Sequence, residues 1–428
     1  MRLAWPVILS NLSVPLLGAV DTAVIGHLPN AANLGAVAIG TMIFSFLYWG
    51  FGFLRMGTTG FVSQANGADD ANEIRSIIAR ALLLGLVLSG LVLSLQWPVL
   101  NIALTLVEGT AEVESGAAEY FGYRIWGAPA ALANYSILGI FIGLGQTRLA
   151  LVTQVFMNSV NIILDLVLVL GFDMGITGVA IATVIAEYMA VVLGLLIVSN
   201  QLKRIGGMWV IQNILSLERF WALMSVNRDI FIRTILLIFT FAYFTATAAS
   251  LGEDKLAAVA VAMNFMHFLA FGLDGFAHAA ESMVGNAIGA KREKRLQEVV
   301  FSSTILAVIV AGLYALVYGF AGDGLINLLT DIEEVRFAAY EFLPWLTVMP
   351  LAAVWSYQLD GIFIGAIRTR EMRNGMIISF IIYFAAIQVF ADSWGTDGLW
   401  LSLILFMLAR AGTLMLMYPA VRRSALKN

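Results

Sequence analysis

Four polar side chains follow one another along an otherwise apolar stretch of the chain: Gln154, Asn158, Asn161 and Asp165. Their spacing of i, i+4, i+7 and i+11 places all four on one face of an α-helix. Amide side chains that lead to a carboxylate on one face are typical either of hydrogen bonding between packed helices or of a site that takes up a proton or cation. We interpret Asp165 with Asn161 as a cation or proton site, and Asn158 equally as part of a structural network.

A second carboxylate, Asp21, lies within the first apolar stretch. Burial disfavours the charged form of a carboxylate, so two such groups that face one cavity form a coupled proton-binding pair. Asp21 and Asp165 are our candidates for that pair. Glu187 follows Thr183 by one helical turn, and it either lines the same cavity or pairs with an arginine.

The second half of the chain has its own acidic candidates. Asp274, His278 and Glu281 occupy i, i+4 and i+7 of one helical face, and Asp360 directly precedes a glycine-rich motif. Histidine and carboxylates at this spacing bind metal in some proteins. The chain has no HExxH pattern, so we favour a polar pairing network and predict no metal site.

Composition indicates which solvent surrounds these residues. The 428 residues are 60% apolar and 12% charged, and apolar runs of about 20 residues or more, such as Ile77–Leu95 and Val179–Val198, recur from end to end. Such runs are long enough to cross a membrane. The absence of cysteine excludes disulfides, thiolate metal ligands and cysteine nucleophiles. The sequence therefore predicts an all-α, multi-pass membrane protein.

We predict twelve spans, which start near residues 4, 34, 77, 117, 149, 176, 229, 256, 299, 338, 374 and 398. Alternate connections differ in charge. One set, with the C-terminal tail, is basic, and the opposite set is acidic, with only Lys255 and Arg336 as cations. Because basic loops stay on the cytoplasmic side, both termini are predicted to be cytoplasmic.

The chain is a tandem duplication. Gly139–Arg148 and Gly361–Arg370 match at seven of ten positions and lie 222 residues apart, and two other motifs match at the same offset. We predict an N-lobe at 1–205, a cytoplasmic linker at 206–228 and a C-lobe at 229–428. Six spans in each lobe make the repeats parallel, and such internal symmetry is typical of transporters.

The duplication also separates the two candidate carboxylates from their counterparts. Asp21 corresponds to Tyr243 and Asp165 to Ile387 in the second half. Both carboxylates therefore belong to the first lobe alone, and this asymmetry favours a specialised role there.

Other chemistries have little support. The chain has no GxxxxGK[ST] or GxGxxG motif and no loop long enough for a nucleotide-binding domain, which argues against an ATP-driven pump. Asp69 and Asp70 resemble a metal-binding pair of a membrane-embedded transferase, but such an enzyme needs a second acidic cluster, which we do not find. A transferase remains a remote alternative.

Six ordered motifs together resemble the multidrug and toxic compound extrusion (MATE) transporters. Four of them are Val14–His27, Gln64–Ala68, Asn161–Asp165 and Gly175–Thr183. The other two, Phe276–Gly285 and Leu359–Gly365, look like the DNA-damage-inducible F (DinF) branch of the family. The resemblance covers essentially the whole chain. It implies two six-helix lobes that form a V, and export of organic, often cationic, compounds driven by inward H⁺ or Na⁺ flow.

The resemblance also implies roles for single residues of the first lobe. Asp21 and Asp165 match the carboxylates that DinF-type members use for cation coupling, and Asn161 matches their associated amide. Thr183 and Tyr120 match lesser members of that network.

The first helix carries three candidate hinge residues. Pro6 resembles the proline at which the first helix of such proteins has been proposed to bend. Pro15 removes a backbone hydrogen-bond donor before Asp21, and Gly18 makes the helix backbone more flexible.

In the second lobe, Asp360 matches an acidic position that contributes to a sodium site in the NorM branch. The seventh span lacks the acidic residue that would complete this site and carries Arg233 instead. This departure favours H⁺ coupling in the first lobe.

The sequence thus predicts a secondary active multidrug exporter that antiports organic, often cationic, compounds against inward H⁺, and not an enzyme. The alternatives are Na⁺ coupling and a flippase for a lipid-linked or amphipathic substrate. We expect a monomer in the bacterial inner membrane, with drugs or organic cations and membrane lipid as its partners, no nucleic acid, and no cofactor other than the coupling ion.

Overall fold

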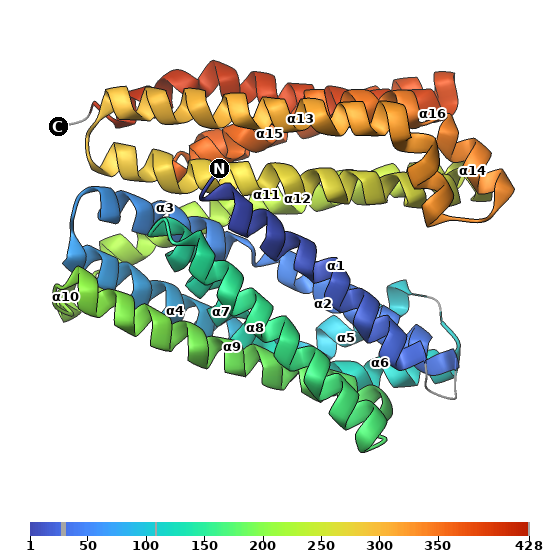
Figure 1. Ribbon diagram of the computed structural model, residues 1–428, viewed down its shortest axis with the longest axis horizontal. Coiled ribbons are helices and arrows are strands. Elements are labelled where there is room, and N and C mark those ends of the chain that lie inside the picture. The colour runs from blue at the N-terminus through green and yellow to red at the C-terminus, as the bar shows by residue number, and fades with distance from the viewer. Residues whose placement is uncertain (27–30, 108, 427–428) are drawn as a thin grey trace. The chain divides into compact units, whose positions relative to one another are not determined.

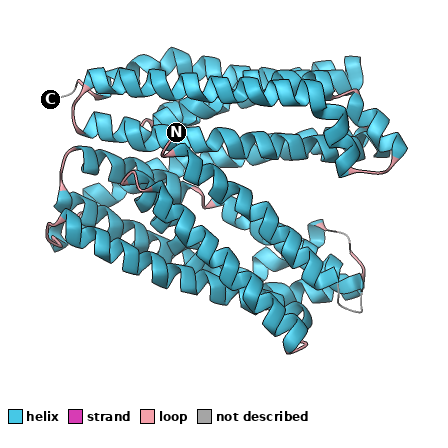
Figure 2. Ribbon diagram, in the orientation of Figure 1, coloured by secondary structure: helices cyan, strands magenta, loops and turns pink. Residues whose placement is uncertain are grey.

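The computed structural model describes residues 1–26, 31–107 and 109–426. These residues are almost entirely helical and include no strand, as Figure 2 shows. The predicted all-α class is therefore confirmed over the described residues.

The helices of the first half are short and frequently interrupted. Their bounds are α1 Ala4–Gly26, α2 Ala31–Gly50, α3 Phe53–Gly67, α4 Ala71–Ser94, α5 Gln96–Leu106, α6 Ala111–Arg124, the 3₁₀ turn η1 Ile125–Gly127, α7 Ala128–Gly143, α8 Thr147–Asp165, the π-helical turn η2 Leu166–Gly171 and α9 Gly175–Ile205.

The second half contains the longest helices, α11, α12, α13 and α16, together with the short α10 and α14 (Figure 1). Their bounds are α10 Ile211–Ile214, α11 Leu217–Ser250, α12 Glu253–Gly289, α13 Glu293–Leu329, α14 Glu333–Tyr340, α15 Leu343–Gly365 and α16 Thr369–Ser424.

The predicted spans all have helical counterparts. Within the three described ranges, nine helical segments are long and apolar enough to cross a membrane, and α14 with α15, bent by 50°, form a tenth. Helix α16 contains two predicted spans, because the backbone of Gly395 (φ 56°, ψ −126°) divides it. Helix α1, 23 residues long, accounts for the first predicted span.

The chain divides into two compact units, which we call the N-terminal unit (residues 9–223) and the C-terminal unit (residues 1–8 and 224–428). The first eight residues group with the second half because Ala4, only 1% exposed, belongs to the hydrophobic core there. The seventh predicted span, α11, begins at Leu217, well before residue 229. The boundaries 1–205, 206–228 and 229–428 remain our proposal for the two lobes and their linker.

The duplicated glycine motif has the same structural task in each unit. A Cβ atom at Gly139 of α7 would collide with the carbonyl of Arg55 in α3, and one at Gly361 of α15 would collide with the carbonyl of Ala277 in α12. In both cases, only glycine lets the two helix backbones approach so closely. The repeat found in the sequence thus marks one helix pair in each unit.

This packing gives a first prediction. Gly361→Ala should destabilise the protein by about 1–3 kcal/mol, because the added methyl group overpacks a backbone contact. The matched control is Gly412→Ala in α16, where a Cβ meets no atom within 4 Å. The control should be neutral or more stable by up to ~1 kcal/mol, as alanine favours the helix. Thermal unfolding in one detergent compares them, and equal melting temperatures would contradict the close-packing role.

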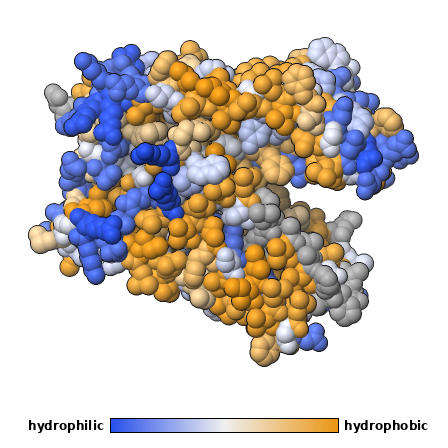
Figure 3. All heavy atoms as spheres, in the orientation of Figure 1, coloured by the Kyte–Doolittle hydropathy of each residue, from blue (hydrophilic) through white to orange (hydrophobic). Residues whose placement is uncertain are grey.

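The outward surface of the C-terminal unit is apolar along its length. In α13, Phe301, Ile309, Leu313 and Phe320 are between 54% and 90% exposed. Figure 3 shows apolar atoms over the middle of this helix and hydrophilic residues at its two ends. A helix with such a surface is suited to hydrocarbon and not to water.

Candidate functional site

The polar face predicted for the first half lies on α8 and points inward. Asn158, Asn161 and Asp165 are 6%, 2% and 0% exposed. Asp165 is the last residue of α8, and the π-helical turn η2 follows it directly. Such π-helical turns are frequent at functional sites in helices. The carboxylate therefore lies at a break in regular helix geometry, fully inside the N-terminal unit.

Asn161 connects this carboxylate to the next helix. With its amide oriented so that Nδ2 faces Asp165, Asn161 donates to Asp165 Oδ2 at 3.3 Å. In the same orientation its Oδ1 accepts from Thr183 Oγ1 of α9, also at 3.3 Å. Asp165, Asn161 and Thr183 thus form one continuous chain of hydrogen bonds between α8 and α9. Sequence reasoning had grouped these three residues, and the structure brings them together.

The other amides of the face connect α8 to α1. Asn158 Nδ2 donates to Ser13 Oγ at 2.9 Å, and Gln154 Nε2 donates to Asn158 Oδ1 at 3.0 Å. These bonds are the interhelical network that was one interpretation of the stripe. Asp21 lies in the same helix as Ser13, two turns further on, but its side chain lies outside the described residues.

Glu187 is held by an arginine. Arg124 donates to both of its carboxylate oxygens, at 2.6 Å and 3.0 Å, and both residues are buried. The guanidinium also lies over the rings of Phe44 and Tyr48, at 5.1 Å and 5.5 Å from their centroids. Of the two interpretations of Glu187, pairing with an arginine is therefore the one that the structure shows. Tyr120 packs edge-on against Phe44 in the same aromatic cluster.

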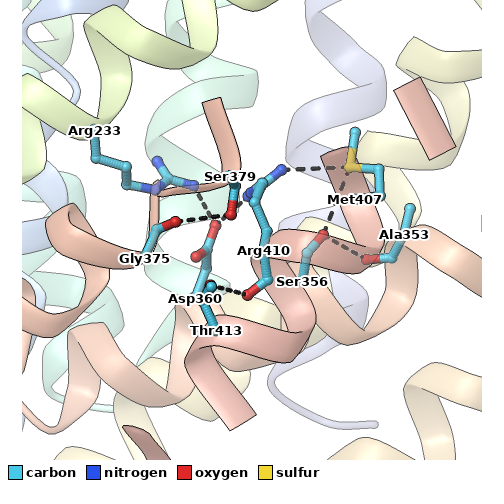
Figure 4. Close-up of polar contacts among 9 residues, drawn as sticks. All are labelled: Arg233, Ala353, Ser356, Asp360, Gly375, Ser379, Met407, Arg410 and Thr413. Carbon is cyan, nitrogen blue, oxygen red and sulfur yellow. Dashed lines mark hydrogen bonds and ion pairs between the residues drawn. The ribbon is translucent and has the colours of Figure 1, made fainter. Parts of the chain in front are cut away.

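In the C-terminal unit, Asp360 of α15 lies between two arginines, as Figure 4 shows. Its Oδ2 accepts from Arg410 Nη2 of α16 at 2.6 Å and from Arg233 Nη2 of α11. Asp360 and Arg233 are each 7% exposed and Arg410 is 3% exposed. Three helices thus meet at one buried carboxylate oxygen.

The two guanidinium groups of this ion cluster are not fully used by Asp360. Arg410 Nη1 is turned toward Met407 Sδ, at 3.4 Å, and the Nε atoms of Arg233 and Arg410 have no hydrogen-bond partner among the described residues. Tyr357 of α15, which is partly buried, and Asp274 of α12 lie near the same cluster. A sodium ion prefers oxygen ligands, whereas Asp360 Oδ2 is already shared by two cations.

Neither Arg410 nor Tyr357 was among the candidate site residues predicted from the sequence. The signal for Arg410 was its charge inside an apolar run, which by itself calls for an acidic partner.

The remaining candidates of the C-terminal unit lie on α12. Glu281 is 1% exposed, whereas Asp274 and His278 are partly buried. Among the residues that the structure describes, no group of three or more histidine, aspartate or glutamate side chains has a metal-binding arrangement.

The hinge candidates all lie in α1. Pro6 is buried near the start of the helix, and the helix continues through Pro15. Gly18 is exposed, and a Cβ there would meet no atom within 4 Å, so packing does not require glycine at this position. Bending at these residues remains a prediction.

With the geometry of both units established, comparison with known proteins identifies the family. The MatE family profile matches residues 6–167 and 230–389, one segment in each half. The chain belongs to the MatE family. It is therefore a multi-pass membrane transporter and not an enzyme, and the resemblance inferred from its motifs is confirmed.

Characterised relatives and solved structures agree with this family. DNA damage-inducible protein F of Escherichia coli K12 is 40% identical over 96% of this chain and 89% of its own length. A probable multidrug resistance protein NorM of Bacillus cereus ATCC 10987 is 24% identical over 100% of this chain and 96% of its own.

Among solved structures, the bent form of the Vibrio cholerae MATE transporter VcmN has a TM-score of 0.88 at 21% identity and covers 99% of this chain and 96% of its own. A MOP superfamily transporter from Pyrococcus furiosus, described as having a binding pocket of reverse polarity, has a TM-score of 0.87 at 18% identity, with coverage of 100% and 96%. At these identities the likeness concerns the fold.

Proposed function

We propose that this MatE protein is a secondary active exporter that exchanges organic, often cationic, compounds for inward-moving H⁺, with Asp165 as a proton-binding group. The observation that carries the proposal is the position of Asp165. This carboxylate is 0% exposed, ends α8 at the π-helical turn η2, and accepts a hydrogen bond from the amide of Asn161, which connects it to Thr183 of α9. Removal from water favours the protonated form of a carboxylate, so a group in this position can take up a proton.

Protonation of Asp165 changes which hydrogen bonds its neighbours can form. An ionised carboxylate only accepts hydrogen bonds, whereas a protonated one also donates. Asn161 would then reverse its amide, and its bond with Thr183 of α9 would change with it. We infer that this is how a proton alters the packing of α8 against α9. Asp21 would be the second carboxylate of the pair, and Pro6, Pro15 and Gly18 would let α1 follow.

The membrane orientation and the substrate class extend the proposal. The charge distribution of the connections supports a bacterial inner-membrane protein with both termini cytoplasmic. Relatives named multidrug resistance proteins support small organic substrates. We expect the exporter to act as a monomer.

One observation favours a second candidate function. The two buried arginines around Asp360 share one carboxylate oxygen, and their Nε atoms have no hydrogen-bond partner among the described residues. Such donors suit an anionic group more than a cationic one. A flippase for an anionic, lipid-linked or amphipathic substrate would use such a site. Export of a cationic dye from everted vesicles, against transport of an anionic amphiphile, separates the two functions.

The ion that drives export can be tested directly. In everted vesicles, a pH gradient alone should drive efflux of a cationic dye and a sodium gradient alone should not. Sodium should also leave the melting temperature of the purified protein unchanged, because Asp360 is already occupied by two arginines. A bound ion at a hundredfold excess over its Kd would stabilise the fold by about 2.7 kcal/mol. A sodium-specific rise that disappears in Asp360→Asn would contradict H⁺ coupling.

A further inference from the structure

The C-terminal unit has a groove that is separate from the ion cluster. It is a cavity of about 550 Å³ between α13, α15 and the last part of α16. Its walls are mostly apolar and aromatic, with Phe301, Trp355 and Met415 between 38% and 68% exposed. Because the apolar surface of α13 continues beyond it, the groove opens toward the hydrocarbon of the membrane.

The floor of the groove contains a polar atom with no partner. Gln358 is 2% exposed, and its Nε2 donates to Ser303 Oγ at 2.6 Å. Its Oε1 is buried and has no hydrogen-bond partner among the described residues. Gln358 thus forms the inner end of the groove, where its side chain connects α15 to Ser303 of α13.

One rim of the groove is basic. Arg422, whose side chain is 51% exposed, lies at this rim and pairs with Glu293 at 2.9 Å. Arg292, Lys294 and Arg295 are exposed where α13 begins. Glu293 and Glu298 lie among these cations, so four cations and two carboxylates give this end a net charge of +2. A basic end next to an apolar groove matches an anionic headgroup joined to a hydrocarbon chain.

In the N-terminal unit, the face that corresponds to the groove is closed. At the 222-residue offset, Gln358 and Ser303 correspond to Ser136 and Ala81, where Ser136 Oγ donates directly to the Ala81 carbonyl at 3.3 Å. The two helices meet there without an amide side chain between them.

The N-terminal unit also covers this face with its own chain. Arg75 donates to the carbonyls of Leu202 and Gly206, at 2.7 Å and 2.8 Å, and Arg80 donates to that of Asn213 at 2.9 Å. These bonds hold the segment after α9 against α4. The same face of the repeat is therefore covered by the segment after α9 in the N-terminal unit and is an open groove in the C-terminal unit.

We propose that the groove binds an anionic phospholipid from the leaflet at the basic ends of α13 and α16. The phosphate lies against Arg422 and its basic neighbours. An acyl chain lies along Phe301 and Met415. Bound lipid takes the structural place that residues after α9 occupy in the other unit.

Native mass spectrometry of the purified full-length protein tests this site, with phosphatidylglycerol, phosphatidic acid and phosphatidylcholine added in separate experiments. We expect the protein to retain phosphatidylglycerol and phosphatidic acid better than phosphatidylcholine. Arg422→Gln should weaken this binding about fivefold, the change typical of one surface cation near anionic lipid. Thr304→Trp, which fills the groove, should abolish the preference for phosphatidylglycerol.

The control is Arg370→Gln, which removes another exposed cation from the basic end of the C-terminal unit but does not line the groove. It should leave binding unchanged. Two results would overturn the proposal: equal retention of phosphatidylglycerol and phosphatidylcholine by the wild type, or equal losses in Arg370→Gln and Arg422→Gln. Melting temperatures measured in phosphatidylcholine identify any variant that has simply lost its fold. If Thr304→Trp is unstable, Arg422→Gln, which changes an exposed position, still tests the proposal.

Discussion

Asp165→Asn is expected to reduce pH-driven efflux to the background of empty vesicles while leaving the protein folded. The amide keeps the shape of the carboxylate and can still hydrogen-bond to Asn161, but it does not titrate. Because Asp165 is fully buried, this loss of titration leaves no route for proton uptake at the α8–α9 contact. Efflux of a cationic dye from everted vesicles measures the effect.

The matched control is Asp173→Asn, an identical chemical change at an exposed position eight residues further along the chain. It should export at the wild-type rate. Asp21→Asn should resemble Asp165→Asn if the two carboxylates act as a pair. Normal pH-driven efflux by folded Asp165→Asn protein would remove this residue from the coupling mechanism.

Asp360→Asn is expected to have the largest effect on stability. The substitution leaves two buried guanidinium groups without their shared carboxylate, and breaking a buried ion pair in this way costs about 3–5 kcal/mol. Thermal unfolding of the purified variant should show a large fall in melting temperature. The physical reason is that Arg233 and Arg410 then repel each other where little water screens them.

An exposed ion pair of the same unit provides the comparison. Asp331 pairs with Arg336 at 2.6 Å, but its side chain is fully exposed. Asp331→Asn should cost ~0–1 kcal/mol, as is usual for surface ion pairs. A similar, small loss for both variants would mean that the arginine cluster does not depend on Asp360.

The local spacing of residues was enough to predict the helices and the polar face of α8. Asn158, Asn161 and Asp165 lie within one helix, so a helical period alone places them on one face. The duplicated glycines were visible as a motif, although their task, a contact between helix backbones, became clear only in the structure.

Partners on different helices could not be read from the chain. Arg124 and Glu187 are 63 residues apart, and Arg233 and Asp360 are 127 apart. Each residue is a charge within an apolar stretch, which predicts that a partner exists but not which one. Only the packing of the helices selects it.

Spacing also could not show the difference between the two units at the groove. Gln358 in place of Ser136 is a single substitution between the repeats, and its consequence depends on how closely α13 and α15 approach. Likewise, the role of Arg75 and Arg80 became clear only in the structure, where both hydrogen-bond to the segment after α9.

Proton release on substrate binding tests the central claim most directly. Purified protein in weakly buffered detergent solution is mixed with a cationic dye at a pH near neutrality, and a pH indicator records the protons released. If Asp165 exchanges its proton for the substrate, the wild type releases protons on binding the dye and Asp165→Asn, which still binds it, releases none. Equal proton release by the two proteins, or dye binding by the wild type with no release at all, would contradict the account.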